Sequence, residues 1–287
     1  MDFRIACAQP KVNKYLPEEK KLDVALEYID RAAETGSKIL CFPEGFPGPY
    51  AGELNWSAFD EISKKAKEYD MCVIYGEVEA NDKEPETNSY FLVSKFVDSD
   101  GKLGGSYRRM HPTPNEVNFA LMNGKVCAPG DDFFIHEVDG VKIGIIICSE
   151  IFNPELSRVL ALEGVEIIFA PIGGMIYELR DAWRCVLWAR AIENLCYTAT
   201  CLSLFGMEDG LAMISSPEKI LAESKEEGLV FADCDIDRVR WLRSQDESLE
   251  LPKPYKVVPG STRMRRPEKY AKLVDESVEI YNFYHYK

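Results

Sequence analysis

Several patterns that mark common classes of functional site are missing from this sequence. None of its nine cysteines forms a Cys-x-x-Cys pair, and it holds only three histidines, so a zinc site is not expected. The Gly-x-Gly-x-x-Gly, Walker and Gly-x-Ser-x-Gly motifs are also absent, which removes the usual signals for a dinucleotide, a nucleoside triphosphate or a serine hydrolase. We therefore expect a site that works without a metal or a cofactor.

Positive charge is scarce as well. The chain carries 34 Lys and Arg against 48 Asp and Glu, a net charge of -14. Binding to nucleic acid or to an anionic membrane surface needs clustered basic residues, so neither partner is expected. The one basic stretch, "STRMRRPEKYAK" at 261–272, fits a solvated tail or a contact between subunits.

Long hydrophobic runs are missing too. No apolar segment approaches the roughly 20 residues that cross a bilayer. The segment "MDFRIACAQP" carries an acidic Asp2 and continues directly as a strand pattern, unlike a secretory signal. We expect a cytoplasmic protein whose cysteines stay reduced and form no disulfide framework.

What the sequence does contain is an alternation of strand and helix patterns. Leu22, Ala25, Leu26 and Ile29 repeat at helical spacing and predict a helix over 17–35. The same kind of pattern predicts further helices at 56–68, 154–163, 178–195 and 237–245. Runs rich in β-branched and aromatic residues predict strands at 3–9, 38–44, 71–78, 89–97, 103–109, 133–138, 141–148, 165–171, 196–204, 211–224 (a hairpin) and 227–236.

Hairpins and crossovers mixed along one chain favour a layered α/β fold, with two mixed β-sheets packed together and helices outside them. The composition is 46% hydrophobic and 29% charged, which suits a globular protein with a sizeable core. We see no linker or low-complexity segment and expect one domain over 1–287. Residues 250–287 are rich in Pro and Tyr, lack a core period, and are interpreted as a C-terminal tail at an oligomer contact.

Three predicted strands end on residues that can carry chemistry. Glu44 follows the strand of "ILCFPEGF", Arg109 ends the strand of "GSYRRMHPTPNE", and Cys148 ends the strand of "GIIICSE". In layered α/β folds the strand ends meet at one rim, which is where sites are usually found. We therefore expect a carboxylate, a cation and a thiol to converge there.

This combination has a coherent chemistry. A thiol becomes a strong nucleophile once it is deprotonated, and a nearby carboxylate can take its proton and pass it to a leaving amine. A fixed cation, together with the N–H of Ser149, can stabilise the oxyanion that forms on the attacked carbonyl. Such a site would cleave a carbon–nitrogen bond through a thioester. Singly, each residue also has a structural interpretation: a buried cysteine, a helix-capping glutamate and a surface ion pair.

Together these motifs resemble the nitrilase, or carbon–nitrogen hydrolase, superfamily. The resemblance runs from "ACAQP" to "VFADCDID" and is strongest in "FPE", "YRRMHPTPNE", "GIIICSEIFNPELSR" and "WARAIENLCY". It implies a four-layer αββα sandwich and a site built from a glutamate base, a lysine and a cysteine nucleophile. Matched motif by motif, Glu44 would be the base, Cys148 the nucleophile and Glu116 a second glutamate that positions the substrate or assists proton transfer.

The lysine is where this sequence departs from that family. The family pattern is Tyr-Arg-Lys, whereas this chain has Tyr-Arg-Arg, and Arg109 occupies the place of the lysine. Arginine keeps a permanent charge and several donors but cannot give up its proton, and its planar head is larger. Stabilisation of an oxyanion is therefore retained in principle, while the geometry changes.

The resemblance implies hydrolysis of a small linear amide, releasing an acid and ammonia or an amine. Cys-Ser-Glu at 148–150, in place of the Cys-Trp-Glu of the nitrilase branch, favours amides, while "HPTPNE" favours that branch. Nitrile and N-carbamoyl substrates stay open, and so does a catalytically impaired member that binds a metabolite or a partner. Tyr50 and His111 are predicted to line the pocket. Members of the family are commonly dimers or larger, so a homodimer or a higher homo-oligomer is expected.

Overall fold

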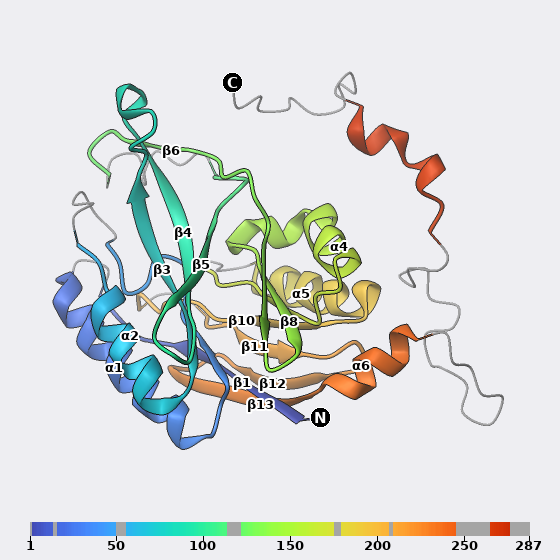
Figure 1. Ribbon diagram of the computed structural model, residues 1–287, viewed down its shortest axis with the longest axis horizontal. Coiled ribbons are helices and arrows are strands. Elements are labelled where there is room, and N and C mark those ends of the chain that lie inside the picture. Colours follow the sequence, from blue (N-terminus) through green and yellow to red (C-terminus); the bar gives the residue numbers. More distant parts are fainter. Residues whose placement is uncertain are drawn as a thin grey trace.

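The computed structural model describes residues 2–13, 16–49, 56–113, 122–174, 179–206, 209–244 and 265–275. Two β-sheets stack face to face, with helices on both outer faces (Figure 1). The α-helices in the described residues are α1 (Glu18–Glu34), α2 (Phe59–Tyr69), α4 (Pro154–Leu162), α5 (Arg180–Asn194) and α6 (Ile236–Arg243). Helices α1 and α2 cover one sheet, and α4 and α5 cover the other (Figure 1). The predicted four-layer αββα sandwich is confirmed.

The first sheet has the strand order β13-β1-β2-β3-β4-β5, with β6 paired to β4. These strands are β1 (Asp2–Gln9), β2 (Ile39–Cys41), β3 (Cys72–Ala80), β4 (Ser89–Val97), β5 (Leu103–Arg108), β6 (Val126–Cys127) and β13 (Gly228–Asp235). Strand β2 runs parallel to both β1 and β3, while β13, β4 and β5 add antiparallel pairs. The sheet is therefore mixed, as the crossovers and hairpins of the sequence predict.

The second sheet has the order β12-β11-β10-β9-β8-β7. Its strands are β7 (Phe134–Val138), β8 (Val141–Ile145), β9 (Ile167–Phe169), β10 (Tyr197–Thr200), β11 (Ala212–Ser215) and β12 (Ile220–Ser224). Strands β8, β9 and β10 are parallel, and hairpins form both edges. The hairpin predicted over 211–224 is present as β11 and β12, and β7 and β8 form a second hairpin.

The main core lies between the two sheets. Ile5 of β1, Phe96 of β4 and Phe169 of β9 are completely buried there. In the run before Cys148, Ile145 and Ile147 belong to this core, whereas Ile146 packs in the cluster under α4 and α5. A strand covered on both faces has no solvent side, which explains an unbroken apolar run. Each such side chain contributes about 1.5–3 kcal/mol of burial free energy.

The helix ends follow ordinary local rules. Helix α1 has Glu18 and Glu19 in its first turn and Arg31 in its last, which complements the helix dipole. Helix α2 ends at Asp70, whose φ of 50° is the left-handed conformation common at helix ends. Helix α6 is capped by Asp235, whose side chain accepts from Arg238 N–H. None of the described helices is both long and apolar enough to span a membrane.

Several predicted strands extend further than the strands of the structure, and two of them lead to Glu44 and Cys148. The strand over 38–44 pairs only at 39–41, and the strand over 141–148 pairs only to Ile145. Residues Cys148–Phe152 form a 3-10 turn instead. Hydrogen bonds still continue along the second sheet, from Ile146 N to Phe169 O at 3.0 Å and from Cys148 N to Pro171 O at 2.8 Å. The paired strand is shorter because the chain bends away there to begin the turn.

The loop after β2 lies directly on β3 at a glycine. Gly76 N–H donates to Phe46 O at 2.7 Å, and a Cβ at Gly76 would lie 2.1 Å from the backbone nitrogen of Gly45. Only a residue without a side chain permits this approach. The position of Glu44, one residue before Gly45, depends on it.

We predict that Gly76→Ala lowers the free energy of unfolding by about 1–3 kcal/mol, because backbone atoms must move to accept the methyl group. Gly144→Ala is the matched control, since its methyl group would meet only the ends of the Leu160 and Val165 side chains, the nearest at 3.1 Å. Urea unfolding of both variants measures the difference. Equal losses in the two variants would contradict this view of the loop.

Candidate active site

Cys148 stands at the point where the second sheet gives way to a turn. Its backbone φ is 56°, a conformation that non-glycine residues rarely adopt. Its N–H is held by Pro171 O, and its side chain is partly exposed. Ser149 is the second residue of the turn, and the first N–H groups of a helical turn have no carbonyl partner within it. The bend therefore places the thiol beside the N–H of Ser149, for which the described residues offer no acceptor.

Glu44 comes from the first sheet, three residues after β2. Phe42 N–H continues the pairing by donating to Ile74 O at 2.8 Å, and the Glu44 side chain is almost completely buried. A Cβ at Gly173 would lie 2.8 Å from Glu44 Oε2, so a residue of the second sheet's rim lies against the carboxylate. Gly173 follows the strand beside β8, and its backbone lowers the pKa of the Cys148 thiol. The two sheets meet at this point.

Arg109 follows β5 and reaches the same place. Its backbone is fixed on both sides: Arg109 N–H donates to Leu92 O, and its own carbonyl accepts from Gly130 N–H, both at 2.9 Å. Arg109 Nη1 donates to Glu44 Oε1 at 2.8 Å, in an ion pair whose two side chains are 5% and 10% exposed. The carboxylate and the cation predicted from separate strand ends are thus in direct contact.

The other guanidinium nitrogens of Arg109 are also engaged. Nε donates to His111 O at 3.0 Å, and Nη2 donates to Thr113 Oγ1 at 2.8 Å and to Ser149 Oγ at 2.5 Å. These bonds, with that to Glu44, use four of the five N–H donors of an arginine. The fifth, on Nη1, has no partner among the described residues.

The surroundings keep the thiol protonated and the guanidinium charged. Burial raises the pKa of Cys148 well above its ordinary value, the Glu44 charge and a hydrogen bond to Glu44 add to this, and Arg109 and Gly173 oppose it only in part. Burial alone would lower the pKa of Arg109, but the nearby Glu44, Cys148 and Glu150 raise it above its usual value. Cys148 therefore needs a base at the moment of attack.

Sequence comparison agrees with this geometry. The profile of the carbon-nitrogen hydrolase family matches residues 4–244. The chain belongs to the carbon-nitrogen hydrolase family.

Individual relatives are distant but cover most of the chain. An omega-amidase from Homo sapiens is 24% identical in an alignment 264 residues long that covers 85% of this chain and 92% of that protein. A 2-oxoglutaramate amidase from Bacillus subtilis is 28% identical in an alignment 260 residues long that covers 85% of this chain and 95% of that protein.

Solved structures share the fold. A carbon-nitrogen hydrolase from Helicobacter pylori matches with a TM-score of 0.77 at 19% identity, over 97% of this chain and 100% of that one. An amidase from Nesterenkonia sp. matches with a TM-score of 0.69 at 21% identity, over 83% of this chain and 92% of that one. The predicted membership of the nitrilase superfamily is confirmed.

The remaining predicted site residues of this hydrolase divide into two groups. Ser149 lies beside Cys148 and contacts Arg109 through its hydroxyl. His111 contacts Arg109 through its carbonyl, and its exposed ring lies 3.4 Å from a Glu150 oxygen, so a contact with substrate stays a prediction. Tyr50 and Glu116 lie outside the described residues. In the part of the chain that is described, no three His, Cys, Asp or Glu side chains are grouped to hold a metal ion.

Glu150 is a residue whose importance the sequence reasoning missed. It is completely buried, and each of its carboxylate oxygens accepts two hydrogen bonds. Oε1 accepts from Met110 N and His111 N, both at 2.9 Å, and Oε2 accepts from Ile147 N at 2.7 Å and Tyr107 Oη at 2.9 Å. Glu150 therefore ties the loop that carries Arg109 to the turn that carries Cys148. A lone acid inside the apolar stretch "IIICSEIF" was the available signal.

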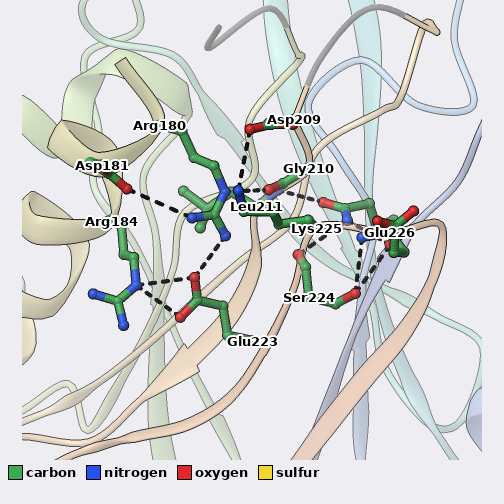
Figure 2. Close-up of polar contacts among 11 residues, drawn as sticks. Arg180, Asp181, Arg184, Asp209, Gly210, Leu211, Glu223, Ser224, Lys225 and Glu226 are labelled. Atoms are coloured by element: carbon green, nitrogen blue, oxygen red, sulfur yellow. Dashed lines mark hydrogen bonds and ion pairs between the residues drawn. The ribbon is translucent and has the colours of Figure 1, made fainter. Parts of the chain in front are cut away.

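A second set of polar contacts lies at the start of α5 (Figure 2). Arg180 Nε donates to Gly210 O at 2.8 Å, and its Nη2 donates to Glu223 Oε1 at 2.7 Å. Arg184, one turn later, donates to both oxygens of Glu223 at 2.8 and 3.0 Å. Gly174, next to Gly173, packs so closely on Phe205 that a Cβ would lie 2.8 Å from its ring. Arg180 thus ties the start of α5 to the backbone at Gly210 and to β12.

We predict that Cys148 alkylation by iodoacetamide increases with pH, with a midpoint above the value of about 8.5 for a free cysteine. Glu44→Gln should move this midpoint down, because the charge that raises the pKa of the thiol is removed. Peptide mass spectrometry reports Cys148 separately, and the exposed Cys185 in the same digest is an internal reference for the reagent. The same midpoint in wild type and in Glu44→Gln would contradict the predicted effect of the Glu44 charge on the Cys148 thiol.

We predict that Glu150→Gln lowers the free energy of unfolding by about 2–3 kcal/mol. Whichever way the amide is turned, its NH₂ group faces two donors and leaves them unsatisfied. Tyr107→Phe, which removes one of the four donors, should cost only about 1 kcal/mol. Urea unfolding measures both, and a Gln variant as stable as the Phe variant would show that the buried carboxylate does not hold the two segments together.

Proposed function

We propose that this protein hydrolyses the carbon–nitrogen bond of a small linear amide through a thioester on Cys148. The observation that carries the proposal is the contact of Glu44 with Arg109 beside the Cys148 thiol. Membership of the carbon-nitrogen hydrolase family supports it. So does a mutant of the Nesterenkonia amidase in which the acetamide moiety of fluoroacetamide is covalently added at the active site cysteine.

In the first half of the reaction, Glu44 takes the proton of the Cys148 thiol as sulfur attacks the carbonyl carbon. The new carbon–sulfur bond moves the carbonyl electron pair onto oxygen. When the tetrahedral species collapses, the carbon–nitrogen bond breaks and the nitrogen receives the proton from Glu44. Ammonia or an amine leaves, and a thioester remains on Cys148.

In the second half, water replaces the amine. Glu44 takes a proton from the water as its oxygen attacks the thioester, the carbon–sulfur bond breaks, and the proton returns to the sulfur. The acid product then leaves. Glu44 thus carries one proton in each direction, and its pairing with Arg109 holds the carboxylate in place throughout.

The negative charge on the carbonyl oxygen needs donors in both halves. The N–H of Ser149 and the remaining Nη1 proton of Arg109 are the donors we assign to it. Preorganised donors of this kind typically contribute 100- to 1,000-fold in rate. Because this role is electrostatic and involves no proton transfer, an arginine can fill the place that a lysine holds elsewhere in the family.

The substrate we favour is a linear acid with a terminal amide, because relatives carry the names omega-amidase and 2-oxoglutaramate amidase. Nitriles and N-carbamoyl compounds are the alternatives with the same site. A binding protein with impaired catalysis is the alternative from another class, and Arg109 is the observation that favours it.

We also propose a cytoplasmic homodimer or larger homo-oligomer, with the C-terminal tail at the contact and no nucleic acid or membrane partner. Within the described stretch 265–275, Leu273 and Val274 are 63% and 83% exposed. Exposed apolar residues of this size favour burial against another surface. Light scattering of the full chain and of a Leu273→Glu variant tests the contact.

We predict ammonia release from a panel of short ω-amides, and loss of turnover in Cys148→Ala. Glu44→Gln should lose about 100- to 10,000-fold in kcat, because it removes the proton carrier. Ammonia release by the folded wild type that persists in Cys148→Ala would exclude the thiol mechanism. Reaction with nitriles or N-carbamoyl compounds alone would shift the substrate class, and no turnover on any compound would favour the binding protein.

A further inference from the structure

The Nη2 end of Arg109 is held by two hydroxyl groups. Ser149 Oγ lies 2.5 Å and Thr113 Oγ1 lies 2.8 Å from Nη2, and the two oxygens lie 3.1 Å apart. They come from two different elements, the turn after β8 and the loop after β5. We call the hydroxyl groups of Ser149 and Thr113 the hydroxyl clamp.

The hydroxyl clamp fits an arginine and not a lysine. Nε, Nη1 and Nη2 of Arg109 each point at a different partner, with Glu44 on Nη1 and the hydroxyl pair on Nη2. A lysine has one nitrogen on a flexible stem and acts as a point charge, so it cannot reach these sites together. If a lysine stood at position 109 and its Nζ contacted Glu44, the hydroxyl clamp would have no cation to bind.

A guanidinium that pairs with one carboxylate can still rotate about that contact. The bond from Nε to His111 O limits this rotation, and the two hydroxyls limit it further because they hold Nη2. The second N–H of Nη1, which does not bind Glu44, then points in a single direction. Ser149 directly follows Cys148, so the same turn sets the nucleophile and the orientation of the cation.

We propose that Ser149 and Thr113 are positioning residues that adapt this site to arginine, by orienting the Arg109 guanidinium toward the reacting carbonyl. This rests on the proposed function for the identity of the reaction, but the contact itself does not depend on which substrate is used. A misplacement of a catalytic group by about 1 Å can cost about 100-fold in rate.

The first test is a double-mutant cycle on turnover. In wild type, Ser149→Ala combined with Thr113→Val should lower kcat about 10- to 100-fold and change KM by less than about threefold, because orientation matters most in the transition state. In Arg109→Lys the same pair of changes should lower kcat by less than about threefold. Thr113→Ser and Ser149→Thr keep the hydroxyls and should keep most of the activity. Equal losses in both backgrounds would overturn the proposal.

The second test needs no turnover, so it stands if no amide is hydrolysed or if Arg109→Lys is inactive. Arg109 lowers the pKa of the Cys148 thiol, so a guanidinium that swings away lets that pKa rise. Ser149→Ala combined with Thr113→Val should shift the pH midpoint of Cys148 alkylation upward. In an Arg109→Met background, which has no guanidinium to orient, the same two substitutions should leave the midpoint unchanged.

Ser216→Ala is the matched control, because it removes a hydroxyl from the turn between β11 and β12 and should change neither measurement. Urea unfolding of every variant confirms that it is folded. No shift in either background, or the same shift in both, would overturn the positioning role. Failure of the amide panel together with a clamp-dependent shift would instead reject the proposed function and retain the clamp.

Discussion

The buried ion pair of Glu44 and Arg109 is the constraint on which the site depends. The two residues follow β2 and β5, which are separated by β3 and β4 in the first sheet, so the loop after each strand must turn inward to bring them together. Two charges removed from water are stable only when their remaining hydrogen-bonding groups are satisfied. The partners that do this are His111 O, Thr113 and Ser149, and they draw the loop after β5 and the turn of the second sheet to the same point.

Other features follow from holding that pair in place. Gly76 allows the Glu44 loop to lie on β3, and Gly173 allows the second sheet to lie against the carboxylate. Glu150, itself buried and fully hydrogen-bonded, fixes the backbone of the Arg109 loop to that of the Cys148 turn. The thiol stays neutral beside a carboxylate until a substrate carbonyl accepts its electrons. The same arrangement that stabilises the ion pair thus sets the protonation states that amide cleavage requires.

Much of this could be predicted from the sequence. The apolar runs and the helical spacing gave the layers and most strand positions, because burial on one or two faces leaves a direct periodic pattern. The convergence of Glu44, Arg109 and Cys148 followed from their places at strand ends. The contact between Glu44 and Arg109 could not be read in this way, because it joins non-neighbouring strands and depends on loop conformation. Glu150 binds backbone groups, Thr113 binds the Arg109 side chain and Gly173 acts by close packing, and no residue spacing records such contacts. Two-residue β6 is too short to show a pattern.

The central claim is that Cys148 carries the acyl group of an amide substrate. The most direct measurement is acid quenching of the enzyme during turnover of an amide that it hydrolyses, followed by peptide mass spectrometry of all nine cysteines. The account predicts an added mass equal to the acyl group on the Cys148 peptide, absent before substrate is added and lost when the substrate is exhausted. Steady hydrolysis with the acyl group on a different cysteine would contradict it.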